Sequence, residues 1–326
     1  MMNSVPMVEI WRGPFLESVH NGHAVICDDT GQIVDAWGNP DQVVLSRSAS
    51  KMIQALPLVT SGAAEAAGLK PEHLALACAS HRGAPLHTEW VTAWLSNLGL
   101  TDHDLRCGAH FPYDAPTEQA MRRAGETPCQ YHNNCSGKHA GFLTLTRHLR
   151  AGPEYIETDH PVQKAVLEAF ERVTGETSPG FGIDGCSAPN FAGSLHAMAR
   201  AMAHFAASPE GSPEATLHRA MRLHPEFVAG EGSACTELMR ATKDKVVIKT
   251  GAEGFYNAIL PDQKLGIALK ISDGATRASE CAIAAILVKL GVLEPDHPAA
   301  ARLMNAPILN RREIVTGWIR PGPALL

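Results

Sequence analysis

The sequence lacks a run of basic residues and any long apolar stretch. Its 28 lysines and arginines are scattered over 326 residues, and the formal net charge is −6. A mildly acidic chain without a basic stripe is repelled by phosphate, so we expect no nucleic-acid partner. The apolar stretches are far shorter than the roughly 20 residues that a membrane-spanning helix needs. We therefore expect no membrane partner either.

The sequence also lacks paired cysteine motifs. Its eight cysteines form no CxxC pair, and the first residues, MMNSVPMVEIWRG, have no apolar run of the kind found in secretory signals. Disulfides are rare in reducing compartments. We therefore expect a cytoplasmic protein whose thiols are mostly free.

Strand-like segments lie near both ends of the chain. Residues 22–27 and 33–37 flank the sequence Asp28-Asp29-Thr30-Gly31, which is typical of a hairpin turn. Three more strand-like segments (245–249, 254–260 and 265–271) precede a helical segment at 275–290. Between the two ends the apolar spacing is helical over 48–60, 87–98, 161–174, 194–207 and 213–224.

These patterns predict an α+β fold in which an antiparallel sheet is built from both chain ends and a mostly helical region is inserted between them. The sheet part would cover about residues 1–45 and 240–326, and the helical part about 46–239. Because the sheet needs both ends of the chain, we expect residues 1–326 to form a single domain.

The first candidate for chemistry is Ser48-Ala49-Ser50-Lys51, at the start of the predicted helix 48–60. Residues three apart share one face of a helix, so the Ser48 hydroxyl and the Lys51 amine can meet there. A serine becomes a nucleophile when a neutral amine takes its proton, and burial or a neighbouring cation such as Arg47 favours the neutral amine. With 17 serines and 10 lysines, however, this spacing arises by chance about as often as not.

A second candidate is Lys249-Thr250-Gly251, on the first of the C-terminal strand segments. Serine β-lactamases and penicillin-binding proteins combine such a triplet with S-x-x-K. A strand that merely turns at Gly251 explains the triplet equally well. The S-D-N element of those enzymes is absent, which disfavours an enzyme directed at penicillin.

The third candidate is the polar cluster Asn133–His139, which leads into an apolar segment. A glycine-containing loop before a helix offers N–H groups to an anion. Cys135 with Lys138 or His139 could also bind a metal, although this spacing falls far short of a structural zinc motif.

Two further polar clusters contain Ser80, within Cys78–Gly83, and Asp184, within Gly182–Pro189. Ser80 follows an apolar segment, where active-site groups often emerge, and Asp184 could bind an ammonium group. Clusters of this kind are more often turns or helix caps.

Taken in order, the blocks RSASK, CASH, NCSGKHAGF, GIDGCSAP, KTGAEGFY and LKISDG resemble the asparaginase II family, which is related to the thermolabile rhizobial L-asparaginase. The resemblance runs from about Val8 to Leu290. It implies a fold like that of serine β-lactamases and glutaminases, and hydrolysis of L-asparagine to L-aspartate and ammonia. It also implies a homodimer.

The resemblance implies two catalytic Ser-Lys pairs, Ser48 with Lys51 and Ser80 with Lys270. With the polar residues of the NCSGKH block included, the expected substrate-binding residues are Arg47, Asn134, Ser136, Lys138, His139 and Asp184. In this assignment Asp184 faces the α-amino group of the substrate and the cations hold its α-carboxylate.

Rhizobial relatives bind zinc through the cysteine and lysine of the CSGK block and through a second cysteine in a later segment. Cys135 and Lys138 are present here, but the later position is occupied by Phe255, which cannot bind zinc. We therefore expect no metal cofactor, unless Cys235 or a histidine replaces the missing ligand.

Two alternatives stay open. The chain could be a glutaminase or another serine acyl-transfer hydrolase of the same fold. Glutamine has one methylene more than asparagine, and such a group changes the free energy that separates two substrates by only about 1–3 kcal/mol. The chain could also be a non-catalytic amino-acid sensor, although the presence of both Ser-Lys pairs argues against that. Which serine is the nucleophile stays open as well.

Overall fold

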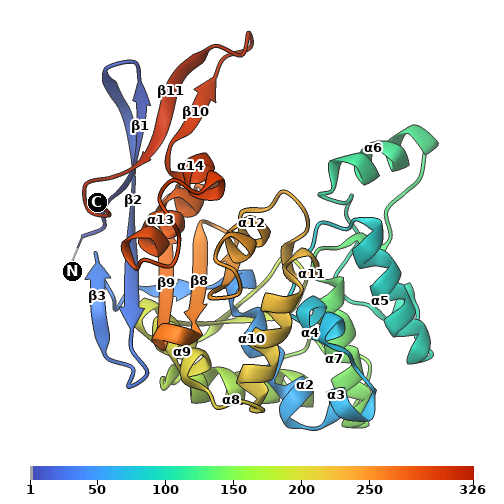
Figure 1. Cartoon of the computed structure of the whole chain (residues 1–326). Coiled ribbons are helices and arrows are strands. Elements are labelled where there is room, and N and C mark those ends of the chain that lie inside the picture. Colours follow the sequence, from blue (N-terminus) through green and yellow to red (C-terminus); the bar gives the residue numbers. More distant parts are fainter. Residues whose placement is uncertain (1–2) are drawn as a thin grey trace. The chain divides into compact units, whose positions relative to one another are not determined.

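The computed structural model describes residues 3–326 (Figure 1). The chain forms two compact units. The first unit contains the chain up to Ala49 together with Gly193–Ala207 and Glu237–Leu326, and the second contains Ser50–Ala192 and Ser208–Thr236. Within the described part of the chain, no helix is both long and apolar enough to cross a membrane.

The first unit is built on an antiparallel sheet. Its strands are β1 (Val5–Arg12), β2 (Phe15–Cys27), β3 (Ile33–Trp37), β7 (Val247–Gly251), β8 (Phe255–Leu260), β9 (Leu265–Ile271), β10 (Ala306–Leu309) and β11 (Val315–Pro321). They follow the order β10-β11-β1-β2-β9-β8-β7, and β3 also pairs with β2. Because β2 pairs with both β1 and β9, the sheet joins the two ends of the chain, which confirms the predicted α+β class.

The predicted hairpin between β2 and β3 is confirmed. Asp28 Oδ1 accepts hydrogen bonds from the backbone of Thr30 and Gln32, and the N–H of Gly31 donates to the Asp28 carbonyl at 2.9 Å. The sequence patterns missed β1, β10 and β11. Strands β10 and β11 lie at one end of the sheet and carry proline or glycine, which weakens the sequence pattern of a strand.

Helix α9 (Leu195–Ala207) packs on β2, β8 and β9, and α13 (Thr276–Lys289) packs on β1 and β11 and on α14 (Pro298–Met304). Gly266 of β9 permits the contact with α9, because a Cβ atom there would lie 2.0 Å from the Ala203 nitrogen. Helix α9 thus belongs to the unit of the sheet, although the predicted helical part, 46–239, included it.

The second unit is mostly helical. It contains α1 (Lys51–Gln54), α2 (Leu56–Thr60), α3 (Ala63–Ala66), α4 (Pro71–Ala77), α5 (Pro85–Asn97), α6 (Ala115–Ala124), α7 (Ser136–His148), α8 (Pro161–Thr174), α10 (Pro213–Leu223), α11 (Pro225–Ala229) and the strand β5 (Phe181–Ile183). The remaining elements are β4 (Val43–Leu45), β6 (Pro189–Ser194) and α12 (Ala234–Ala241). Helix α7 is central, since it is buried from Ser136 to Thr146 and packs on α4, α5 and α8.

The predicted helix 48–60 is wrong as a single element. A 3-10 turn at Arg47–Ser50 is followed by the short helices α1 and α2, which meet at Ala55. Pro57 explains the break, because proline has no N–H to continue a helix and its ring clashes with the preceding turn. The other predicted helices correspond to α5, α8, α9, α10 and α13.

Candidate functional site

Lys51 begins α1 and is only 1% exposed. Its Nζ lies 3.1 Å from Ser80 Oγ and 3.1 Å from Cys135 Sγ, and it also donates a hydrogen bond to the Ala79 carbonyl. An ammonium group has three donors for these three partners, whereas a neutral amine has two donors and could accept the Ser80 proton. The geometry therefore suits proton exchange between Lys51 and Ser80.

Ser80 sits in a loop that hydrogen bonds of the backbone and of the His81 ring hold in place. Its N–H donates to the Val228 carbonyl at 2.9 Å. The next residue, His81, is fully buried, accepts a hydrogen bond from the Gly83 N–H at Nδ1 (3.1 Å) and lies 2.9 Å from Ser136 Oγ at Nε2. Burial lowers the pKa of His81 well below its usual value, so the ring is neutral and Nε2 carries the proton.

The Ser136 hydroxyl makes two hydrogen bonds, since it accepts one from His81 and donates one to the Tyr131 carbonyl at 3.0 Å. This hydroxyl ties the first turn of α7 to the Ser80 loop. The side chain of Ser136 is fully buried.

Lys138 and Cys186 form a buried pair with Nζ and Sγ 3.0 Å apart. A hydrogen bond from Cys135 is the largest cause that lowers the pKa of the Cys186 thiol well below its usual value, and the charge of Lys138 adds to it. Burial alone would lower the pKa of Lys138, but the sulfurs of Cys186 and Cys135 raise it, and Asp184 acts in the same direction. Both shifts favour a thiolate at Cys186 beside an ammonium group at Lys138.

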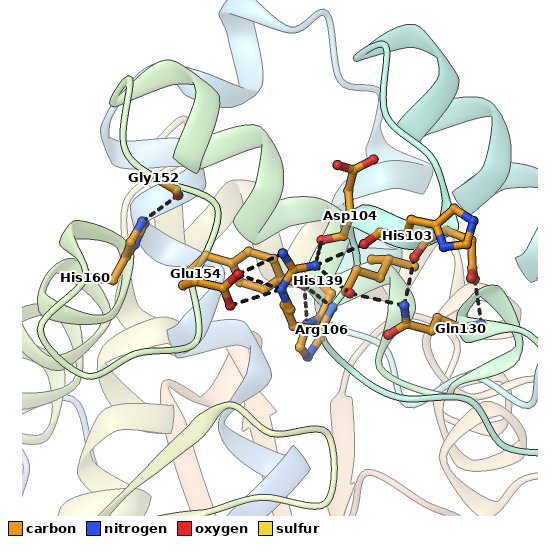
Figure 2. Close-up of polar contacts among 11 residues, drawn as sticks. His103, Asp104, Arg106, Gln130, His139, Gly152, Glu154 and His160 are labelled. Carbon is orange, nitrogen blue, oxygen red and sulfur yellow. Dashed lines mark hydrogen bonds and ion pairs between the residues drawn. The ribbon is translucent and has the colours of Figure 1, made fainter.

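Tyr155 fixes the orientation of the His139 ring through its hydroxyl. The Tyr155 hydroxyl accepts from the Arg106 N–H at 2.7 Å and lies 2.8 Å from His139 Nδ1, so it donates to that nitrogen. Figure 2 shows Arg106 itself fixed by Glu154 and by backbone carbonyls of residues 103–105. His139 Nε2 is buried and has no hydrogen-bond partner among residues 3–326.

Burial is the largest influence on the pKa of His139 and lowers it, while the nearby Cys186 opposes this effect. The Nδ1 nitrogen is occupied as an acceptor, so the proton of the neutral ring lies on Nε2. His139 thus offers a single buried N–H on the side of Cys186.

In the first unit, Ser48 lies in the 3-10 turn directly after Arg47, whose φ of 51° is unusual for a residue other than glycine. The end of β7 presses on this turn, because a Cβ atom on Gly251 would lie 2.2 Å from the Ser46 carbonyl oxygen. Asn257 of β8 donates to the Ala49 carbonyl at 3.1 Å. Strained backbone held by its surroundings is common at functional sites.

The first unit also contains a cavity of about 470 Å³, lined by His23, Gln42, Val43, Val44, Leu45, Arg47, Glu253, Lys270 and Ser272. Arg47 and Lys270 were expected at the site from the sequence. Burial lowers the pKa of Lys270, although the charges of Glu253 and Asp273 oppose the shift. The Lys270 amine donates a hydrogen bond to the Glu253 carbonyl.

The model of the L-asparaginase II family matches residues 8–321. The chain belongs to the L-asparaginase II family. Membership confirms the resemblance seen in the sequence. No curated protein matches the chain.

Several solved structures are similar at low sequence identity. The native form of Mglu is 12% identical with a TM-score of 0.48, over 85% of this chain and 66% of that one. A beta-lactamase from Mycobacterium bovis is 13% identical with a TM-score of 0.46, over 82% of this chain and 94% of that one. The chain thus spans slightly less than two thirds of the length of Mglu.

Sequence reasoning missed Cys186 and the contact between Lys51 and Ser80. Cys186 stands within the GIDGCSAP block, but only Asp184 of that block was singled out. The sequence signal that could have identified Cys186 is its position inside a polar turn flanked by glycine. The partner of Lys138 lies 48 residues away along the chain, so no local pattern could have paired the two.

The zinc ion implied by the resemblance can be tested against these residues. No three histidine, cysteine or acidic side chains gather as a metal site in the described part of the chain. Cys135, Cys186 and Lys138 nevertheless supply two sulfurs and a nitrogen, and zinc binds sulfur and nitrogen donors. These donors could hold zinc only after the Lys138 ammonium group releases its proton, so the expected absence of a metal cofactor stays a prediction. Phe255 is fully buried in β8, opposite Lys270 in β9.

Proposed function

We propose that the chain hydrolyses the side-chain amide of L-asparagine to give L-aspartate and ammonia. The observation that carries the proposal is the 3.1 Å contact between Lys51 Nζ and Ser80 Oγ in a member of the L-asparaginase II family. A lysine amine beside a serine hydroxyl is the pair that acyl transfer needs, because the amine can take and return the hydroxyl proton.

In the proposed mechanism the Ser48 oxygen attacks the amide carbon while Lys51 takes the Ser48 proton. Ser80 serves as a proton relay. The C–N bond then breaks, the leaving nitrogen takes the proton, and ammonia departs from an acyl-enzyme ester. Water hydrolyses the ester and regenerates Ser48. Backbone N–H groups stabilise the negative oxygen in both steps. Lys270 would be a second base, and burial lowers its pKa.

Substrate binding in this proposal uses Arg47, Asn134, Lys138 and His139 as donors, and Asp184 for the α-amino group. Ser136 would act by holding the first turn of α7, because its hydroxyl bonds to His81 and Tyr131. A zinc ion would be held by Cys135, Lys138 and Cys186, and when bound it would supply a positive charge. We propose no step that depends on a metal.

The test is to measure ammonia release from L-asparagine by Ser48→Ala and Ser80→Ala separately. Loss of the nucleophile should lower kcat by on the order of 10⁴-fold or more. Loss of a proton relay should lower it by about 10²- to 10⁴-fold. Ser61→Ala, in an exposed turn of the second unit, is the matched control and should be fully active. Near-wild-type turnover by Ser48→Ala would show that Ser48 is not the nucleophile and would favour Ser80.

The same assay with L-glutamine separates asparaginase from glutaminase activity. Binding of L-asparagine by calorimetry with no aspartate formed over hours would instead support the sensor alternative. Our proposal further includes a cytoplasmic location and a homodimer, and sedimentation of the purified chain would test the dimer.

A further inference from the structure

His23 is a cavity-lining residue with no role so far. It lies on β2, is 8% exposed, and shares the cavity of about 470 Å³ with Arg47 and Lys270. In the antiparallel pair of β2 and β9, His23 stands directly opposite Lys270. Opposite residues in such a pair point to the same side of the sheet, with Cβ atoms about 4.5–5.5 Å apart. A group bound by His23 is therefore next to Lys270.

The surroundings fix the proton of the His23 ring. The N–H of Asn39 donates to His23 Nδ1 at 2.9 Å. Gly38 has a φ of 71° and brings the chain so close that a Cβ atom on it would lie 2.3 Å from Nδ1. An accepting Nδ1 means that the neutral ring carries its proton on Nε2. His23 Nε2 has no hydrogen-bond partner in the part of the chain that the structure describes.

The charges around the ring favour an acceptor as its partner. Burial lowers the pKa of His23, and the charge of Lys270 lowers it further, so the ring stays neutral at neutral pH. The other ionisable groups of the cavity are Arg47, Lys270 and Glu253. Arg47, and Lys270 when it is protonated, are offset by only one carboxylate, and together with an N–H donor that cannot accept they favour an anion. A carboxylate offers acceptor oxygens and no donor.

We infer that His23 is a substrate-binding residue whose Nε2–H donates to the α-carboxylate of the amino acid, alongside Arg47. The inference rests on the proposed function and deepens it, since it names which part of the substrate this cavity holds. A carboxylate bound by His23 leaves the amine of Lys270 beside the substrate. The volume of about 470 Å³ accommodates a small amino acid.

The test compares the binding of L-aspartate with that of β-alanine, which lacks only the α-carboxylate, by titration calorimetry on the full chain. In His23→Leu, L-aspartate should bind about 10- to 100-fold more weakly, as expected for one lost hydrogen bond to a charged group. The affinity for β-alanine should change less than about 3-fold. His23→Gln keeps a donor and should recover most of the L-aspartate affinity.

His20→Leu is the matched control, because His20 lies on the same strand, is also buried, and contacts Asp273 outside the cavity lining. It should bind both ligands as the wild type does. His23→Phe removes the donor at nearly constant volume and serves if His23→Leu does not fold. Equal weakening of both ligands, or unchanged L-aspartate binding, would overturn the inference. So would wild-type protein that does not bind L-aspartate.

Ammonia release by the wild type keeps the two proposals apart. A chain that binds L-aspartate in the expected His23-dependent way but releases no ammonia refutes the asparaginase proposal and leaves the carboxylate site standing. An active chain whose L-aspartate affinity does not depend on His23 refutes only the carboxylate site.

Discussion

At the scale of single residues, Lys51 Nζ makes hydrogen-bond contacts with groups from distant segments of the second unit. The Ala79 carbonyl and the Ser80 hydroxyl follow α4, and the Cys135 sulfur precedes α7. None of these partners carries an acidic side chain, so a charged Lys51 would be stabilised by hydrogen bonds alone. The contact with the Ser80 hydroxyl places the Lys51 amine where the two groups can exchange a proton.

Lys51→Arg tests this role, because a guanidinium group keeps its proton in proteins while a lysine amine can release it. We expect kcat for L-asparagine to fall by about 10²- to 10⁴-fold in Lys51→Arg, and by a similar factor in Lys51→Met. Lys164→Met, at an exposed position of α8, is the control and should keep full activity. If Lys51→Arg retained most of the activity, Lys51 would act only through its charge.

The sequence identified many of these residues but not their partners. The S-x-x-K spacing concerns residues three apart, whereas the Lys51 contacts with Ser80 and Cys135 span 29 and 84 positions. Such contacts arise only when helices pack, and local periodicity contains no information about them. The resemblance supplied Ser80 as a site residue, although it paired Ser80 with Lys270 and Lys51 with Ser48.

At the scale of elements, the strongest sequence patterns gave correct predictions. Helix α8 and strand β9 have the predicted bounds, because long amphipathic and continuous apolar segments leave little ambiguity. The failures have local causes, such as Pro57 in the segment predicted as one helix. Helix α7 begins at Ser136, inside the cluster that was expected to precede it.

The packing of α9 on the sheet is the element contact most open to a test. A Cβ atom on Gly266 would lie 2.0 Å from the Ala203 nitrogen and 2.3 Å from the Ala199 carbonyl oxygen. Backbone atoms cannot turn aside as a side chain can, so α9 must move away from β9 in Gly266→Ala. We expect the free energy of unfolding to fall by about 3 kcal/mol or more.

Urea unfolding followed by circular dichroism measures this loss. Gly152→Ala is the matched control, since no described atom lies within 4 Å of a Cβ atom at that position. It should change the free energy of unfolding by less than about 0.5 kcal/mol. A Gly266→Ala protein as stable as this control would mean that α9 does not rest on β9 as closely as the structure shows.

At the scale of the whole molecule, the chain passes from one unit to the other at residues 49, 192, 207 and 236. Neither unit is a continuous piece of sequence. The predicted limits of the sheet part, 45 and 240, lie close to two of these crossings, whereas the placement of α9 required knowledge of packing. Ser48 and Lys270 belong to the first unit, and Lys51 and Ser80 to the second. The single domain that we predicted stays a prediction.

Buried histidines make the stability of the molecule sensitive to acid. Burial lowers the pKa values of His73, His81, His87, His139 and His218 in the folded chain. Between their ordinary and lowered pKa values the unfolded chain binds protons that the folded chain does not. Each such histidine therefore costs stability as the pH falls below about 6.5, and the loss is complete below its folded pKa.

His218 offers the clearest measurement, because burial, assisted by the charge of Arg222, lowers its pKa to about 4. From pH 7.5 to pH 5 this one group should reduce the free energy of unfolding by about 2 kcal/mol. In His218→Leu that contribution disappears, so the difference in urea stability between the two pH values should shrink by about the same amount. His148→Leu, at an exposed position, should leave the difference unchanged. An equal pH dependence in His218→Leu and the wild type would mean that His218 takes up its proton as readily in the folded chain as in the unfolded one.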